Sequence, residues 1–511
     1  MPVNNTHPDY DAALPAWLRA RDVIAGEDAV KAAGEKYLPR LDAQSDDDFK
    51  AYKARALFFN ATARTADGFL GLIFRRDPTV KTPEGASRTG SHSGLALALA
   101  EFLDDADLQG TALTSYGKNV VGEVVGVGRA GTLVDWGGNG DTGNHSGESR
   151  TGQGRAYAVL YRAEQILNWR TERVNGRNTV TLVVLREDAV VVGEGADEFD
   201  SSIVEQIRVL KLVRSSAEKP DTASGWRYEV EIWRPRREWT WRGLRVKWEL
   251  AESLVPVRLG RPLPEIPFVF HGPQHSLPNI SKLPLADIIS ANLDHYRLDA
   301  DFKHGLHYTA LPTAYVSGFD KDAELRIGSN TAWTTDAIGA TAGFLEFKGQ
   351  GLQTFERAMD RDERLMAILG SRMLEAQKRV GETADAIELR QSGENSVLST
   401  LSLSVSDGLT HVLRWVAWWN STEALPEDIG EDRVLVQLNT DFSNKGMASD
   451  EVAAIVSAWQ AGAISRETMF DLFRRGEVMP AGRSDEEEKR LVAASRPPAS
   501  TPAGNQPGAM Q

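Results

Sequence analysis

The fold is decided by the stretch that opens with LPLADIISANLDHYRLDADFKHGLHY, residues Leu283–Tyr308. Apolar residues recur at three- and four-residue steps over Leu285–Tyr308, which predicts a long helix with one apolar stripe. The stripe consists of Leu285, Ile288, Ile289, Leu293 and Tyr296. Two more long helices are predicted downstream, Leu352–Leu374 and Asn395–Asn420, and Gly408 is a point where the last of them is expected to bend.

The segments between these helices differ from them. Leu311–Phe347 breaks into short extended pieces with scattered glycine and aspartate, which predicts a small extended insertion. Gln377–Leu389 is polar and connects the second helix to the third.

An antiparallel sheet is predicted upstream. Apolar and charged residues alternate in Arg227–Trp233 and again in Leu244–Leu250, and Arg242–Gly243 is the expected hairpin turn between them. This alternation predicts one solvated face. Ile266–Gly272 is predicted to be a short buried strand, and the first eighty residues are predicted to be helical.

Three glycines match the spacing of a dinucleotide-binding loop. Gly126, Gly128 and Gly131 would have to open a helix for pyrophosphate to meet its N-terminus, but they lead into the strand-like Thr132–Trp136. A tight turn between a helix and a strand is the better interpretation. Gly137–Gly154 is then a surface loop.

Two short helices are predicted near the C-terminus, Asp450–Gln460 capped by Ser449 and Arg466–Arg474 capped by Ser465. The second one is poor in the basic and amide side chains of a DNA-recognition helix, so the pair is interpreted as packing helices. From Ala481 onward the chain is charged and then rich in Pro, Ala and Gly, and disorder is predicted for residues 481–511.

Composition narrows the class of protein. The chain has 511 residues, which suggests about three substructures. It has no cysteine, which excludes disulfides and thiolate chemistry and fits maturation in a reducing cytoplasm. No apolar run approaches the roughly 20 residues that span a bilayer. A net charge of −14 argues against a surface that grips phosphate throughout, but not against DNA as a passing ligand.

No catalytic motif is present. The phosphate-binding loop of packaging ATPases, the nucleophile elbow and the paired-histidine zinc motif are all missing. Asp301, His304 and His307 form the best candidate metal group, but a further ligand is lacking. No enzyme activity, cofactor or metal is therefore expected.

Four segments of the chain are distinctive as whole stretches: HPDYDAALPAWLRARDVIAGEDAVKAAGEKYLPRL, YKARALFFNATARTADGFLGLIFRRDP, LADIISANLDHYRLDADFKHGLHYTALPTAYVSG and LGSRMLEAQKRVGETADAIELRQSGENSVLSTL. Through them the chain resembles the portal proteins of tailed bacteriophages over roughly Pro8–Gly476. The resemblance implies an α+β portal fold with a wing, a two-helix stem, a clip, a tunnel loop, a long wing helix and a small helical crown. The implied parts are a wing (1–284), stem helices (285–308 and 352–376), a clip (309–351), a tunnel loop (377–394), a long wing helix and strand (395–446) and a crown (447–480).

The resemblance also implies a function. Such a protein forms a homo-oligomeric ring, commonly of twelve subunits, at one capsid vertex, and double-stranded DNA passes through it during packaging and ejection. The implied partners are terminase, the head–tail adaptor and the major capsid or scaffolding protein; the implied location is the virion, after assembly in the host cytoplasm. The candidate DNA-facing residues are Lys378, Arg379, Glu382 and Thr383, and the candidate inter-subunit residues are Arg357, Asp360, Arg361 and Arg364.

Two other classes of protein remain open. A metal-dependent enzyme built around Asp301, His304 and His307 would be a small oligomer with a polar pocket. Another head component, such as an adaptor, would normally be much shorter than 511 residues.

Overall fold

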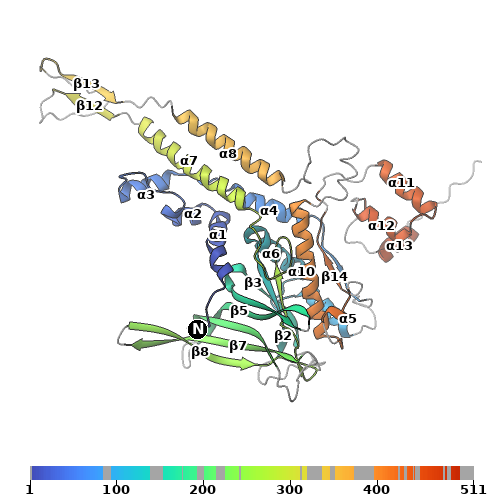
Figure 1. Ribbon diagram of the computed structural model, residues 1–511. Coiled ribbons are helices and arrows are strands. Elements are labelled where there is room, and N and C mark those ends of the chain that lie inside the picture. The colour runs from blue at the N-terminus through green and yellow to red at the C-terminus, as the bar shows by residue number, and fades with distance from the viewer. Residues whose placement is uncertain are drawn as a thin grey trace, which may run out of the picture. The chain divides into compact units, whose positions relative to one another are not determined.

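A computed structural model shows a protein of mixed α and β structure (Figure 1). It describes residues 3–83, 94–138, 154–174, 176–192, 201–214, 225–240, 243–310, 313–318, 336–345, 351–372, 396–423, 426–430, 434–440, 442, 449–475, 478–479 and 485–494. The chain divides into two compact units. Unit 1 is Met1–Phe74 with Pro78–Thr440, and unit 2 is Arg75–Asp77 with Asp441–Gln511.

Helices form the first part of unit 1, as the sequence predicts for the first eighty residues. They are α1 (Pro8–Ala25), α2 (Glu27–Ala32), η1 (Gly34–Lys36), α3 (Asp46–Arg55), α4 (Ala61–Ile73), α5 (Gly94–Asp104) and α6 (Leu113–Val127). Side chains cap several of them: Ser45 accepts a hydrogen bond from the Asp48 amide, and Asn60 accepts one from the Ala63 amide.

Two antiparallel sheets follow. The smaller has the order β11–β2–β3, and the larger has the order β4–β5–β6–β7–β8. Their strands are β2 (Ala130–Gly138), β3 (Gly154–Arg162), β4 (Ile166–Val174), β5 (Arg177–Val192), β6 (Ser201–Arg214), β7 (Trp226–Thr240), β8 (Gly243–Leu254) and β11 (Phe268–His271). The 3-10 helix η2 (Ala163–Gln165) joins β3 to β4, and β9 (Val257–Arg258) pairs with β10 (Arg261–Pro262). The predicted hairpin is confirmed, but Gly243 pairs with Thr240 and belongs to β8 rather than to the turn as predicted.

The glycine-rich segment makes the predicted turn. Helix α6 ends at Gly128, whose φ of 80° is the left-handed conformation that favours glycine, and β2 begins at Ala130. Gly131 lies inside β2 under the ring of Phe268, where an added Cβ would lie 2.3 Å from a ring carbon. Residues 139–153 of the predicted loop lie outside the described residues.

The long helices of unit 1 are α7 (Ala286–Ala310), α8 (Leu352–Arg372) and α10 (Val397–Trp419). They confirm the three helices predicted from the sequence, to within two residues at each of their ends. The strands β12 (Thr313–Ser317) and β13 (Thr341–Leu345) form a hairpin between α7 and α8. The 3-10 helix η3 (Pro426–Asp428) follows α10, and β14 (Leu435–Gln437) pairs with β1 (Thr79–Lys81).

Helix α10 is buried despite its many hydroxyl groups. Three of these groups bond to the backbone of neighbouring segments: Ser404 Oγ donates to the Gly272 carbonyl at 2.8 Å, and Ser406 Oγ accepts from the Leu438 amide at 2.9 Å. Thr410 Oγ1 accepts from the Val436 amide at 3.0 Å. Ser404, Ser406 and Thr410 therefore satisfy backbone groups that would otherwise be buried without partners.

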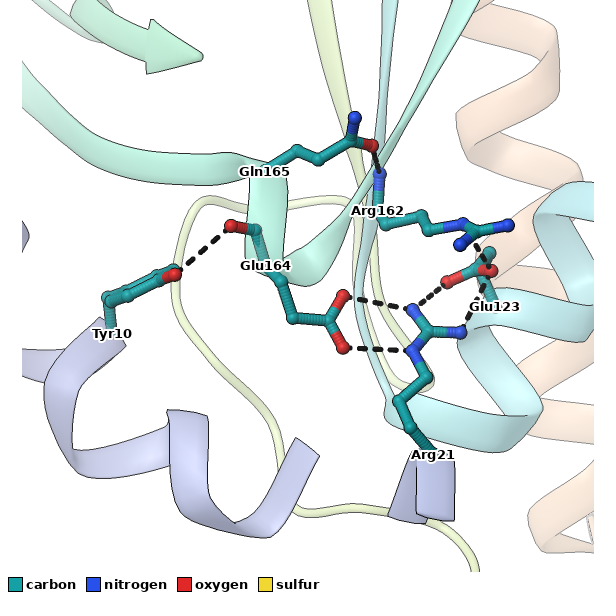
Figure 2. Close-up of polar contacts among 6 residues, drawn as sticks. All are labelled: Tyr10, Arg21, Glu123, Arg162, Glu164 and Gln165. Carbon is teal, nitrogen blue, oxygen red and sulfur yellow. Dashed lines mark hydrogen bonds and ion pairs between the residues drawn. The ribbon is translucent and has the colours of Figure 1, made fainter. Parts of the chain in front are cut away.

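Figure 2 shows an ion cluster that ties α1 to α6 and η2. Arg21 Nε lies 2.8 Å from Glu164 Oε1, and Arg21 Nη1 lies 3.0 Å from Glu123 Oε1. Tyr10 donates to the Glu164 carbonyl at 3.0 Å. Burial alone would raise the pKa of Glu164, but its bonds to Arg21 outweigh burial and hold the pKa below its ordinary value.

Unit 2 contains α11 (Ser449–Gln460), α12 (Arg466–Arg475) and α13 (Asp485–Ala494). Met469, Phe470 and Met479 form its buried core, and Ser465 caps α12 by accepting from the Thr468 amide at 3.0 Å. The first two helices are as predicted.

The prediction of disorder from residue 481 is wrong for Asp485–Ala494. This charged run forms helix α13 because its charges have partners on α12. Asp485 bonds Arg474, and Lys489 lies 3.6 Å from Glu467. Residues 495–511 lie outside the described residues.

No helix within the described ranges combines the length and the apolar character needed to cross a bilayer.

Gly408 gives a first prediction. It faces His271, and an added Cβ would lie 2.4 Å from His271 Nδ1. We expect Gly408→Ala to lower the free energy of unfolding by about 1–2 kcal/mol, because overpacking outweighs the gain in helix propensity. The control is Gly122→Ala on α6, where the new Cβ meets no atom within 4 Å. Gly122→Ala should raise the free energy of unfolding by about 0.5–1 kcal/mol. Equal effects of the two substitutions in denaturant unfolding would contradict the close packing of α10.

Arg21 gives a second prediction. Arg21→Ala leaves Glu123 and Glu164 without their shared cation. It should lower the free energy of unfolding by about 2 kcal/mol, after allowance for the partial exposure of Arg21. The pKa of Glu164 is lowered in the folded protein, so this stabilisation is present above the ordinary pKa of 4.5 and is lost at lower pH. The thermal unfolding midpoints of the wild type and the variant should therefore converge as the pH falls below 4.5.

The control for this experiment is Arg19→Ala on the same helix, since Arg19 has no ion pair among the described residues. A difference between wild type and Arg21→Ala that stayed constant down to pH 3 would contradict the assignment.

Candidate functional site: the paired helices α7 and α8

The candidate site is built on α7 and α8, which run antiparallel and lie side by side (Figure 1). At 25 and 21 residues they are about 37 and 32 Å long. Gly305, near the end of α7, permits close approach: an added Cβ would lie 2.8 Å from Leu352 at the start of α8. Farther along the pair, His295 Nε2 lies 3.4 Å from Glu363 Oε1.

Helix α7 is fixed to the N-terminal helices by buried polar side chains. Asn292 accepts from Thr62 Oγ1 at 2.8 Å and donates to the Phe59 carbonyl at 2.7 Å. Asp299 accepts from the Leu57 amide at 2.6 Å. These bonds hold the extended segment between α3 and α4 against one face of α7.

Helix α8 turns a stripe with three- and four-residue spacing toward α7. Its members, which are buried or half-buried, are Leu352, Phe355, Met359, Asp362, Met366 and Leu369. Asp362 interrupts this apolar stripe with a carboxyl group that is 3% exposed. Burial, with a smaller contribution from Asp294, raises the pKa of Asp362. The interface between the two helices is therefore not wholly apolar.

The four inter-subunit candidates lie on the exposed side of α8. Arg357, Asp360, Arg361 and Arg364 are all exposed. Beside them Leu365 and Ile368 are 42% and 46% exposed. This face combines charges of both signs with apolar side chains. Its contact with a second copy remains a prediction.

The β12–β13 hairpin lies at the end of the pair where α7 stops and α8 starts. Tyr315 pairs with Gly343 across the hairpin, and its ring covers the glycine. Phe344 is 55% exposed. The hairpin occupies the region predicted to be the clip, 309–351, of which 311–312, 319–335 and 346–350 lie outside the described residues.

The four tunnel-loop candidates cannot be placed in this structure. Lys378, Arg379, Glu382 and Thr383 fall in residues 373–395, which lie outside the described residues. They remain predictions from the sequence resemblance.

The group around His304 does not form a metal site. Asp301 accepts a hydrogen bond from Tyr52 at 2.5 Å, and the Tyr52 and His304 rings meet edge to face at 5.2 Å. Within the described part of the chain, no three His, Cys, Asp or Glu side chains are placed to hold a metal ion. Asp301 and His304 are thus part of the packing between α3 and α7.

Glu123 and Glu164 are two neighbouring carboxylates, and general acid–base catalysis often uses such a pair. Both are bonded to Arg21, and the lowered pKa of Glu164 keeps its carboxylate ionised (Figure 2). A general acid needs a raised pKa, so this pair is structural.

Sequence reasoning missed the anchors on α7 and Asp362 on α8. A signal for Asp362 was present, because it falls at a stripe position with the spacing of its apolar neighbours. The partners of Asn292 and Asp299 lie more than 200 residues away in the chain, and no local pattern reveals them.

Comparison with known proteins gives one family match. Residues 284–420 match the model of a family described as "Domain of unknown function (DUF4055)". This range contains α7, the β12–β13 hairpin, α8 and α10. No curated protein sequence matches the chain.

Among solved structures, chains of a gene transfer agent particle are similar. The neck of the empty particle, computed with C6 symmetry, is 11% identical, covering 92% of this chain and 99% of that chain, with a TM-score of 0.32. The neck of the native particle, computed with C12 symmetry, is 12% identical, covering 88% of this chain and 98% of that chain, with a TM-score of 0.33. A chain of the virion of the native particle is 12% identical, covering 92% of this chain and 99% of that chain, with a TM-score of 0.32. TM-scores this low carry no argument about the present chain.

Proposed function

We propose that the protein is a phage portal protein, a ring subunit at one vertex of the capsid and a structural protein without enzymatic activity. The observation that supports this most directly is the arrangement of α7, the β12–β13 hairpin and α8. Two helices of about 35 Å lie side by side, with a hairpin at one end, and buried polar side chains anchor α7 to the N-terminal helices. Repeated around an axis, such pairs would line a channel.

The exposed face of α8 supports a closed ring. Ring closure uses head-to-tail contacts, so each copy must offer two different surfaces. Arg357, Arg361 and Arg364 on one copy would meet acidic groups on the next, and Asp360 would meet basic ones. Leu365 and Ile368 add apolar area to the same face.

In this proposal the regions have separate tasks. The β12–β13 hairpin binds terminase during packaging and the head–tail adaptor afterwards. The segment with Lys378, Arg379, Glu382 and Thr383 approaches the DNA duplex. A net charge of −14 suits a channel through which the duplex moves without being held.

Images of the purified full-length protein in negative stain test the ring directly. We expect rings of about a dozen subunits with a central hole. Discrete monomers or dimers at all protein and salt concentrations would contradict the proposal.

The DNA-facing segment gives a separate prediction. Lys378→Glu with Arg379→Glu should lower the amount of DNA that particles protect from nuclease and leave the rings intact in images, because like charge would repel the moving duplex. The control is Lys50→Glu with Arg173→Glu, two exposed basic residues elsewhere. Unchanged protection in the first variant would remove Lys378 and Arg379 from the channel.

A further inference from the structure

Strands β7 and β8 continue beyond their pairing with the rest of the larger sheet. Strand β6 pairs with β7 only between Ile207–Trp233 and Arg214–Trp226, whereas β7 and β8 remain paired from Trp233–Leu250 to Thr240–Gly243. Figure 1 shows the two strands side by side. Residues 233–240 and 243–250 therefore form a two-stranded extension of the sheet, referred to below as the ribbon.

The ribbon has a charged face and an apolar face. Because side chains alternate along a strand, the register places Arg234 opposite Glu249 and Arg236 opposite Lys247 on one face. Ion pairs occupy this face: Arg234 lies 2.8 Å from Glu252, and Arg236 lies 3.3 Å from Glu249.

The other face of the ribbon presents apolar side chains. The register groups Trp233 with Leu250, Pro235 with Trp248 and Arg237 with Val246, so this stretch of the face is apolar apart from the position of Arg237. Val246 is 51% exposed and Leu250 is 48% exposed. The sequence-based prediction of a single solvated face is therefore wrong for the ribbon, since its apolar face is also open. Two-stranded hairpins with an uncovered apolar face are marginally stable in water, so this face requires a cover.

The charge of the ribbon indicates what covers it. Residues 234–249 contain six basic and two acidic residues, a net charge of +4, and this leaves −18 on the remainder of a chain whose total is −14. The ribbon is thus complementary in charge to the surface of its own kind of chain. Its tryptophan, valine and leucine side chains favour a protein surface over the phosphates of a duplex, which need polar donors.

We propose that the apolar face of the ribbon docks on a second copy of this chain. This inference rests on the proposed ring, in which one copy contributes the ribbon and its neighbour a different surface. The contact would be additional to that of α8. It would hold adjacent copies together at the larger sheet as well as at the paired helices.

The absence of cysteine makes a direct test possible, because an introduced thiol is the only one in the chain. Val246→Cys places it on the apolar face, and Lys247→Cys places the matched control on the charged face of the same strand. Reaction with a maleimide is followed by mass spectrometry on ring and monomer fractions of each full-length variant. We expect Cys at 246 to react at least tenfold more slowly in rings than in monomers, and Cys at 247 to react at similar rates in both.

The outcomes separate this inference from the proposed function. Rings in which the thiol at 246 reacts as fast as in monomers would overturn the docking and leave the portal proposal standing. Protection that appears only when duplex DNA is added would overturn it in favour of a nucleic-acid contact. A wild-type protein that forms no ring would overturn both.

A second variant tests the contact without labelling. Val246→Asp with Leu250→Asp should shift the population from rings to monomers at least tenfold in sedimentation, with an unchanged far-ultraviolet circular dichroism spectrum showing that the chain still folds. Rings as abundant as in the wild type would contradict the proposal.

Discussion

The architecture of unit 1 depends on satisfying the buried polar groups of helix α7. Asn292 and Asp299 face the N-terminal helices rather than solvent, and each would be costly to bury alone. Their bonds to Thr62, Phe59 and Leu57 fix which residues of the N-terminal segment face α7. Since α8 packs on α7, and the β12–β13 hairpin joins their ends, the placement of the whole candidate site follows from this contact.

Helix α10 shows the same principle in the core. An apolar helix would leave the backbone of β14 and of the segment after β11 without partners on that side, and its serine and threonine hydroxyls supply them. Hydrophobic burial therefore holds the layers of unit 1 together. Hydrogen bonds between side chain and backbone determine how those layers are aligned.

Much of this could be predicted from the sequence, because local patterns carry it. The three long helices, the β7–β8 hairpin, the turn at Gly128 and the cap at Ser465 each depend on residues close together in the chain. The open apolar face of the ribbon could not be predicted, since alternation in a strand does not say whether anything covers it. Helix α13 was missed because its charged run is stabilised by partners on α12, beyond any local pattern.

The anchors on α7 also set an order of events during synthesis. Thr62 leaves the ribosome 230 residues before its partner Asn292, and Tyr37 precedes Arg297, whose Nε donates to its carbonyl, by 260 residues. At translation rates of about 5–20 residues per second, the N-terminal helices wait roughly 10–50 s for α7. During that interval the faces of these helices that pack on α7 lack their native partner, so this part of the nascent chain stays exposed to aggregation until α7 has been made.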